Sequence, residues 1–290
     1  LRWMEKKDLL GQDMFLLGAH SPMRRHLAFK FCELHNRECE YVALTADTSE
    51  ADLKSRRELR REGKSARLSV VWEDQAVVRA AIHGRILILE GLEKAERNVL
   101  PIINNLLENR EMALEDGRFL VAPKRFDELM SRVRQASSSG NDDDTSALRS
   151  GRLVRVDPHF RVIAVGVPAP PFPGNPLDPP LRSRFQARHI GRAPADVLVH
   201  ALRHEAPTMP TEKMTHLLSL YEAIWTLGDD RGNASGIENR NMAYSSLCYP
   251  SEQSVLSACR LLESVPSIGV HDALARIFPF SPESGMLEGE

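Results

Sequence analysis

The sequence predicts an α/β fold in which a parallel sheet is flanked by helices, followed by a smaller helical domain. Over the first two thirds of the chain, short apolar runs alternate with helical patterns, which is typical of a parallel sheet. The expected strands are apolar throughout, so they suit burial on both faces. They are Met14–Gly18, Glu40–Leu44, Arg85–Leu89 and Phe160–Val165. After Arg192 the pattern is wholly helical, so we expect an α/β domain over residues 1–192 and a helical domain over residues 193–290.

Helices are expected between the strands and again after the domain boundary. In the α/β domain they are Met23–Leu34, Gln75–Ile82 and Val99–Glu108, the last capped by Asn98. In the helical domain they are Ala195–His204, Glu212–Thr226, Glu252–Ser264 and His271–Ile277, interrupted by a loop that contains Gly228, Gly232 and Gly236. An Asp116-Gly117 pair between apolar flanks predicts a hairpin over Glu111–Ala122.

Three segments fall outside this alternation. Residues 136–151 are polar and low in complexity, which predicts a disordered insertion. Val167–Pro180 holds seven prolines, so we expect an extended, stiff connection without regular structure. The basic run Lys54–Arg61 contains one acidic residue and no aromatic side chain. It predicts a helix that is solvated or lies at a module interface, in preference to a surface for RNA or acidic lipid.

The composition is that of a soluble globular protein. Hydrophobic residues make up 42% and charged residues 27% of the 290 residues, and the net charge is −2. This near-neutral balance gives no support for a nucleic-acid partner. Apolar runs such as Ile86–Leu89 are too short to span a bilayer. The chain starts at Leu1 without an initiator Met or a signal peptide, so we expect a piece of a longer protein.

The cysteines and histidines do not predict a metal site. The four cysteines form no C-x-x-C pair and lack zinc-site spacing, so we expect buried free thiols in a reducing compartment. His200 and His204 are four residues apart on an expected helix, but no third ligand accompanies them. We therefore expect both histidines to lie on a solvated helix face, and we predict no metal ligands.

The segment between the first strand and the first helix of the α/β domain has the outline of a phosphate-binding loop. Such a loop follows the pattern G-x-x-x-x-G-K-[ST]. Its positions here are Gly18, Ala19, His20, Ser21, Pro22, Met23, Arg24 and Arg25. Methionine thus replaces the second glycine, and arginines replace the lysine and the hydroxyl residue. Two interpretations stay open: a loop that holds phosphate through its arginines and the helix N-terminus, or a loop kept only as a strand-to-helix corner.

Four further segments carry a resemblance to a known family. They are Gly84–Ala95, with the strand and the x-x-K-A that follows it, Leu106–Arg110 (LLENR), Leu114–Arg118 (LEDGR) and Asn175–Phe185 (NPLDPPLRSRF). Together they resemble the dynein, MoxR and midasin branch of the AAA+ ATPases. The resemblance implies a P-loop NTPase fold with a helical lid, ATP or ADP as ligand, and neighbouring AAA+ modules of the same chain or ring as partners. It also implies an unknown protein client and a mitochondrial location.

The resemblance assigns roles to single residues, several of which have changed. Glu90 stands at the Walker B aspartate, and Gly91 stands where the catalytic glutamate is expected. The strand that should end in a polar sensor residue ends in Gly166, and the second sensor arginine falls near Gln253. Arg184 matches the arginine finger that acts in trans, with Arg182 as the second choice for that role. These losses predict weak nucleotide binding, a doubtful Mg²⁺ site and no hydrolysis of ATP by this module. Two alternatives stay open: an active ATPase module with an unorthodox arginine-based site, and a nucleotide-free interaction scaffold.

The substitutions also predict a specific contact. Arg25 starts a helix where the Mg²⁺ ligand would lie, and Glu90 ends a neighbouring strand, so we expect Arg25 or Arg24 to pair with Glu90. We expect this pair to be buried, so removing one partner, as in Glu90→Ala, should cost about 3–5 kcal/mol and lower thermal stability. Glu93, three residues further along the chain, is expected to face away from the site.

Overall fold

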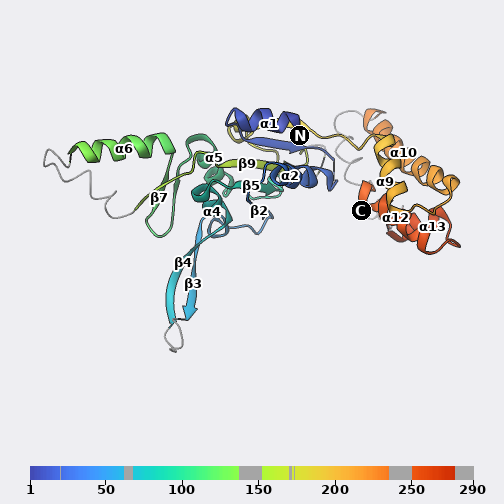
Figure 1. The fold of residues 1–290 in the computed structure, drawn as a ribbon, viewed down its shortest axis with the longest axis horizontal. Helices are drawn as coiled ribbons and strands as arrows, with labels where there is room; N and C mark the ends of the chain where they lie inside the picture. The colour runs from blue at the N-terminus through green and yellow to red at the C-terminus, as the bar shows by residue number, and fades with distance from the viewer. Residues whose placement is uncertain are drawn as a thin grey trace. The chain divides into compact units, whose positions relative to one another are not determined.

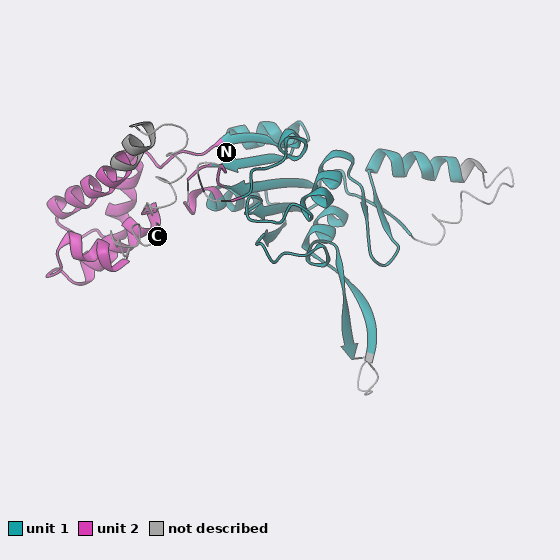
Figure 2. Cartoon of the chain, turned by 180° about the vertical axis from the view of Figure 1, so that it is seen from behind, with its two compact units in different colours: residues 1–17, 25–166, 175–188 teal, residues 18–24, 167–174, 189–290 magenta. Residues whose placement is uncertain are grey.

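The structure, a computed structural model, describes residues 1–19, 21–61, 68–136, 152–169, 172, 174–234 and 250–277. The chain folds into two compact units, which Figure 2 colours separately. The sheet unit comprises residues 1–17, 25–166 and 175–188, and the helical unit comprises residues 18–24, 167–174 and 189–290. The loop after the first strand therefore groups with the helical unit. The division into domains at residue 192 stays a prediction.

A five-stranded sheet forms the centre of the sheet unit (Figure 1). Its strands are β1 (Met14–Leu17), β2 (Cys39–Ala43), β5 (Ile86–Glu90), β9 (Arg161–Gly166) and β10 (Gln186–His189), in the spatial order β10-β1-β9-β5-β2. The pairs β1–β9, β5–β9 and β2–β5 are parallel, so their carboxyl ends meet at one edge of the sheet. The predicted parallel sheet is confirmed, and each predicted strand is present with small shifts at its ends.

The sheet unit also contains helices (Figure 1). They are α1 (Arg2–Leu9), α2 (Met23–Leu34, whose first two residues group with the helical unit), α3 (Glu50–Leu53), α4 (Ala76–His83), α5 (Leu100–Asn109), α6 (Pro123–Ala136) and α8 (Pro179–Arg184). The three helices predicted here are confirmed as α2, α4 and α5. Asn98 does not cap α5, because the helix starts one residue later, with Val99 at the N-cap position and a proline in its first turn.

Two helices lie where the sequence did not predict them. The segment Val167–Pro180 was expected to lack regular structure, but Pro179 and Pro180 start α8, since proline has the right backbone φ for the first turn of a helix. The helix α6 was not expected at all. Its apolar residues Phe126, Leu129 and Val133 nevertheless recur at helical spacing. Residues 137–151 of the predicted disordered insertion lie outside the described residues.

The basic run Lys54–Arg61 is a strand, not the helix we expected. Strand β3 (Ser55–Arg61) pairs antiparallel with β4 (Leu68–Asp74) in a two-stranded hairpin that projects from the five-stranded sheet (Figure 1). The partner strand is rich in valine and also contains a tryptophan, which favour strands, and cross-strand side-chain contacts stabilise the pairing. A separate three-stranded sheet joins β6 (Met112–Ala113), β7 (Phe119–Val121) and β8 (Leu153–Arg155), and its β6–β7 pair is the predicted Asp-Gly hairpin.

The helical unit contains the helices predicted for the C-terminal part. They are α9 (Ala195–Glu205), α10 (Thr211–Ala234), α12 (Glu252–Ser264) and α13 (Val270–Ile277), which enclose a core of their own. The expected break at Gly228 and Gly232 is wrong, because α10 continues through both. A glycine inside a helix costs about 1 kcal/mol relative to alanine, which is too little to end a helix by itself. Gly236 lies outside the described residues.

The remaining expectations concern thiols, histidines and the membrane. Cys32 and Cys259 are buried free thiols, and Cys39 is a half-buried one, while Cys248 is not among the described residues. His200 and His204 are exposed on α9, as predicted for a solvated helix face. In the described ranges, no three His, Cys, Asp or Glu side chains gather closely enough to hold a metal ion. Of the described helices, none is long and apolar enough to cross a bilayer.

Candidate functional site

The loop after β1 approaches the segment that enters the helical unit very closely. A Cβ atom at position 18 would lie 2.3 Å from the carbonyl oxygen of Ile190, so only glycine fits there. Ala19 packs against the hydrophobic core of the helical unit. The glycine shared with phosphate-binding loops therefore has a packing reason in this chain. His20 lies outside the described residues.

Arg24, at the position where the loop pattern leads us to expect a phosphate-binding lysine, is directed back into its own loop. Its side chain is buried, and Nη1 donates a hydrogen bond of 2.8 Å to the carbonyl oxygen of Gly18. A buried guanidinium needs such a partner because desolvation of an unpaired cation is costly. One donor that could reach a phosphate is thereby used within the loop.

Ser21 joins the loop to the first turn of α12. Its Oγ donates to Oε2 of Glu252 at 2.7 Å and accepts a hydrogen bond from the backbone N–H of Met23 at 3.1 Å. The other carboxylate oxygen of Glu252 accepts from the N–H of Ala193 at 3.4 Å, and the side chain is buried. The resemblance pointed to Gln253, but that side chain is exposed, and Glu252 is the residue that faces the loop. A carboxylate thus lies beside the loop, where the family pattern leads us to expect a sensor arginine.

The predicted ion pair between Arg25 and Glu90 is confirmed. Arg25 Nε lies 2.6 Å from Oε2 of Glu90 and Nη2 lies 2.8 Å from Oε1, which is a two-bond fork. Tyr41 donates its hydroxyl to the same Oε2 at 2.7 Å, and the Arg25 guanidinium lies 5.8 Å from the Tyr41 ring centroid. The hydrogen bonds that Arg25 donates to Glu90 raise the pKa of Arg25. Burial, and after it the hydrogen bond that Tyr41 donates to Glu90, raises the pKa of Tyr41.

The pair is not buried, which corrects the energetic expectation. The side chain of Arg25 is 52% exposed and that of Glu90 is 25% exposed. Solvent screens such a pair, and exposed pairs are typically worth about 0–1 kcal/mol instead of the 3–5 kcal/mol lost when a buried pair is broken.

Gly91 and Gly166 occupy positions where a larger side chain does not fit. Gly91 has φ +88°, and a Cβ there would lie 2.9 Å from the carbonyl oxygen of Leu44. A Cβ at Gly166 would lie 2.6 Å from Oε2 of Glu93. The expectation that Glu93 faces away is therefore wrong: its buried carboxylate lies against the end of β9, at the carboxyl edge of the sheet. The connection beyond β5 turns it there, with Asn175 N–H donating to its carbonyl oxygen at 2.7 Å.

The two finger candidates on α8 differ in their partners. Arg184 forms an ion pair with Glu108 of α5, with 2.6 Å between Nη2 and Oε2. Arg182 is exposed and has no side-chain partner within the described part of the chain. The first choice is thus held inside the sheet unit, and the second choice is accessible.

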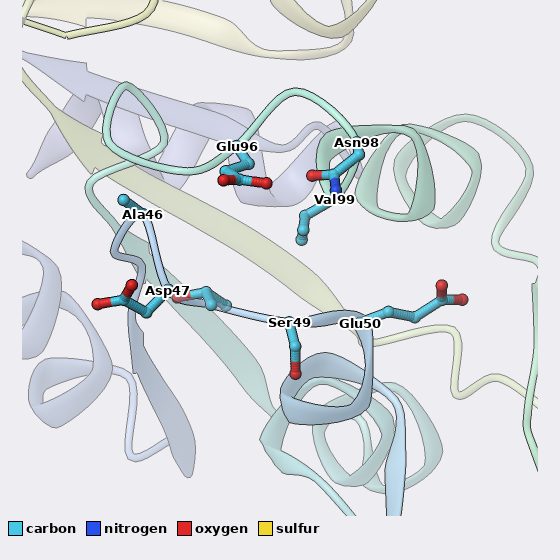
Figure 3. A pocket seen from close by; sticks show the side chains of 8 residues that line it. Ala46, Asp47, Ser49, Glu50, Glu96, Asn98 and Val99 are labelled. Carbon is cyan, nitrogen blue, oxygen red and sulfur yellow. The ribbon is translucent and has the colours of Figure 1, made fainter.

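A pocket of about 480 Å³ opens elsewhere in the sheet unit (Figure 3). It is lined by Ala46, Asp47, Thr48, Ser49, Glu50, Glu96, Asn98 and Val99. None of the predicted site residues lines it. Figure 3 shows Glu96 and Asn98 on one side and the segment from Ala46 to Glu50 on the other.

The fold and the loop define the class of this protein. Residues 13–185 match the family model described as AAA domain (dynein-related subfamily), which is more than half of the chain. The chain therefore belongs to the dynein-related AAA family, whose fold is a nucleotide-binding one.

A particular relative shares nearly the whole chain. The von Willebrand factor A domain-containing protein 8 of Mus musculus is 44% identical over 281 residues, which cover 97% of this chain. The chain spans 13% of the length of that relative, so it corresponds to an AAA module of a much larger protein. Among solved structures, an assigned ATPase of Cytophaga hutchinsonii aligns over 98% of this chain and 78% of its own, with 12% identity and a TM-score of 0.47. A RuvB variant of Thermotoga maritima aligns over 95% and 66%, with 11% identity and a TM-score of 0.42.

Proposed function

We propose that this AAA module does not hydrolyse ATP and serves a larger AAA protein as a structural module that supplies an arginine to a neighbouring module. The observation that carries the proposal is the fork between Arg25 and Glu90. In a working site of this class, a hydroxyl and an acidic residue hold Mg²⁺. Here a guanidinium replaces the hydroxyl and already neutralises the carboxylate.

These residues do not fit a bound Mg²⁺. A divalent cation prefers oxygen ligands in octahedral geometry, and Arg25 offers only donor nitrogens at its position. Both oxygens of Glu90 already accept hydrogen bonds, Oε1 from Arg25 and Oε2 from Arg25 and Tyr41. The charge of Arg25 would also repel the ion. We therefore assign no step of a reaction to a metal at this position.

The loop is also poorly suited to the phosphates themselves. Arg24 is buried against the Gly18 carbonyl, and the carboxylate of Glu252 lies at hydrogen-bond distance from Ser21. An anion approaching Ser21 would meet a buried negative charge, which opposes the favourable field of the helix N-terminus. We expect nucleotide binding to be weak and independent of Mg²⁺, because Arg24 must first leave the Gly18 carbonyl.

One observation favours a second candidate, an active site of unorthodox type. The Glu93 carboxylate is buried at the carboxyl edge of the sheet beside Gly166, where a carboxylate could act as a general base. Arg25 and Glu90, which do not fit a bound Mg²⁺, argue against this second candidate. Glu93→Gln separates the two, because it abolishes any hydrolysis that depends on this carboxylate.

Calorimetric titration with ATP and ADP, each with and without Mg²⁺, tests the nucleotide side of the proposal. We expect weak heats that do not depend on Mg²⁺, and no phosphate release in a steady-state assay. Tight binding that requires Mg²⁺, together with turnover lost in Glu93→Gln, would overturn the proposal in favour of the active site.

The arginine side of the proposal concerns neighbouring modules, and the expected setting is a mitochondrial protein that remodels a client protein. Arg182 is the accessible guanidinium, whereas Arg184 must first leave Glu108. In a longer protein that carries this module, Arg182→Ala or Arg184→Ala should lower ATP turnover at least about tenfold, because finger arginines act on the transition state. Arg203→Ala on α9 is the control for loss of an exposed arginine. Unchanged turnover in both finger variants would leave only the structural role, as in an interaction scaffold.

A further inference from the structure

The hairpin β3–β4 has two faces of different chemistry. Its register places Arg57 opposite Trp72 and Leu59 opposite Val70, and these residues share one face with Arg61 because strand side chains alternate. We call the described side chains of this set the cationic face: Arg57, Leu59, Arg61, Val70 and Trp72. The other face carries Arg56, Glu58 and Arg60 from β3, with Ser69, Val71 and Glu73 opposite them.

The second face neutralises its own charges. Arg56 Nη2 lies 2.7 Å from Oε1 of Glu58, and Arg60 Nη2 lies 3.2 Å from Oε2 of Glu73. Each arginine of this face therefore has a carboxylate of the same face as its partner. Little charge remains to attract another molecule.

The same side of the hairpin also carries Asp74, opposite Ser55, but the Asp74 carboxylate pairs with Arg118. The arginines of the cationic face therefore have no such compensation. The guanidinium of Arg57 lies 4.6 Å from the centroid of the Trp72 ring, and no described carboxylate pairs with Arg57 or Arg61. Between the two arginines, Leu59 is 71% exposed and Val70 opposite it is 63% exposed. Exposed aliphatic side chains at matched positions of a projecting hairpin have no role in the core, so their exposure points to a partner.

We propose that the cationic face docks a protein segment in which carboxylates flank an apolar residue at alternate positions. The order along β3 is cation, aliphatic, cation at every second residue, and an extended segment presents its side chains with the same period. A carboxylate, an apolar side chain and a second carboxylate on one side of such a segment match Arg57, Leu59 and Arg61 in turn. Val70 widens the apolar contact.

Two other polyanions fit the face less well. A nucleic acid gains from arginines and from stacking on aromatic rings, but the Trp72 ring is covered by Arg57, and aliphatic residues add nothing to phosphate contacts. A lipid surface needs a broader apolar face than the pair of aliphatic side chains offered here. The exposed Leu59 and Val70 therefore favour a protein segment.

A fluorescence-anisotropy titration of the chain tests this proposal. The probe is a labelled peptide made of repeats of Glu-Thr-Val-Thr, and the control peptide has Gln in place of Glu. The double variant Arg57→Glu/Arg61→Glu changes the cationic face. The double variant Arg56→Glu/Arg60→Glu makes the same change of charge on the opposite face and is the matched control.

We expect the acidic peptide to bind and the Gln peptide to bind at least about tenfold more weakly, because charge pairs on this face contribute to the affinity. Arg57→Glu/Arg61→Glu should weaken binding about tenfold or more, and the opposite-face variant by less than about threefold. Leu59→Ser should weaken binding without a change of charge. Arg57→Gln/Arg61→Gln provides the same test if the reversed charges disturb the hairpin in circular dichroism.

Three results would overturn the proposal. The first is equal loss of binding in the two double variants, which indicates attraction to net charge alone. The second is an acidic peptide that does not bind. The third is tighter binding of single-stranded RNA or of phosphatidylserine vesicles than of the peptide, with the same dependence on Arg57 and Arg61.

Discussion

Arg25 and Glu90 form a two-bond fork between the first turn of α2 and the last residue of β5, with 2.6 and 2.8 Å between their paired atoms. Tyr41 of β2 adds a third member through its hydroxyl. The fork lies where the resemblance to AAA modules leads us to expect a metal ion, and it connects the start of a helix to two neighbouring strands. Its exposure to solvent limits how much it stabilises the fold.

Glu90→Ala should lower the stability of the chain without any nucleotide present. We expect a loss of about 1 kcal/mol, because the pair is part-exposed but has ideal fork geometry. For a chain of this size that corresponds to a fall of about 2–4 °C in Tm. Glu96→Ala, which removes an exposed glutamate without a side-chain partner in the described residues, is the control. A double-mutant cycle with Arg25→Ala isolates the pair, and a coupling energy near zero would contradict this assignment.

A glutamate introduced at position 91, where the resemblance leads us to expect the catalytic glutamate, should not create an ATPase. A residue with a side chain at φ +88° is strained, and the added Cβ would lie 2.9 Å from the Leu44 carbonyl oxygen. We expect Gly91→Glu to cost at least about 1–2 kcal/mol in the free energy of unfolding, measured in urea. We expect no phosphate release from Gly91→Glu in a steady-state assay.

Gly117 offers a matched control for this position. It has a similar φ of +85°, but no atom lies within 4 Å of the place where its Cβ would be. Gly117→Ala therefore reports the backbone strain alone, and Gly91→Ala reports strain plus crowding. Equal losses of stability in the two alanine variants would show that the Leu44 carbonyl moves aside without cost.

Much of the fold could be predicted because its signals are local. The strands of the central sheet are continuous apolar runs between turns, and the helices from Met23 to Leu34 and from Glu252 to Ser264 follow a helical period. The predictions were wrong where pairing with another strand, and not the local pattern, sets the conformation. The arginines of β3 have no periodic apolar pattern of their own, and β4 decides their conformation by pairing with them.

The candidate site could likewise be predicted only in part. Arg25 and Glu90 were predictable as a pair because a parallel sheet brings the end of a strand close to the start of the first helix. Glu93 was misplaced because the direction of a side chain in the connection after β5 depends on backbone turns without a sequence signature. The contact between Ser21 and Glu252 joins residues 231 positions apart, and no local pattern marks either residue for the other.

The stability of the chain should depend on acid through Glu40. This carboxylate accepts hydrogen bonds from Arg79 at 3.1 and 2.9 Å and from Arg85 at 2.6 Å, and these bonds, that of Arg79 foremost, lower its pKa. A lowered pKa in the folded state means stability that is present above the unfolded value of about 4.3 and lost as the pH falls through the folded value. The difference in unfolding free energy between wild type and Glu40→Gln should therefore be largest near neutral pH and shrink on acidification.

Glu38→Gln is the control for this dependence on pH. Among the described residues, the carboxylate of Glu38 pairs with Arg85 alone, and its side chain is 76% exposed. We expect a small, nearly constant difference from wild type across the same pH range. If Glu40→Gln behaves like Glu38→Gln in urea unfolding from pH 7 to pH 3, the arginine pair around Glu40 does not stabilise the fold through its charge.

The carboxylate of Glu252 beside Ser21 predicts how the loop responds to anions. A buried negative charge beside the expected phosphate position opposes binding, and one such repulsion at about 4 Å amounts to about 1 kcal/mol even with the screening of bulk water. In Glu252→Gln the amide oxygen can still accept the Ser21 hydrogen bond, so the charge is removed while the contact can be kept.

Glu252→Gln should therefore bind Mg²⁺-free ATP about fivefold more tightly than wild type in calorimetric titration, since about 1 kcal/mol of repulsion is removed. Glu212→Gln, at the exposed start of α10 in the same unit, makes the same change of net charge and should leave the affinity unaltered. Ser21→Ala should not reproduce the gain, because it removes the hydroxyl but keeps the charge. Equal gains in ATP affinity in Glu252→Gln and Glu212→Gln would assign the effect to net charge and show that Glu252 does not specifically oppose anion binding at the loop.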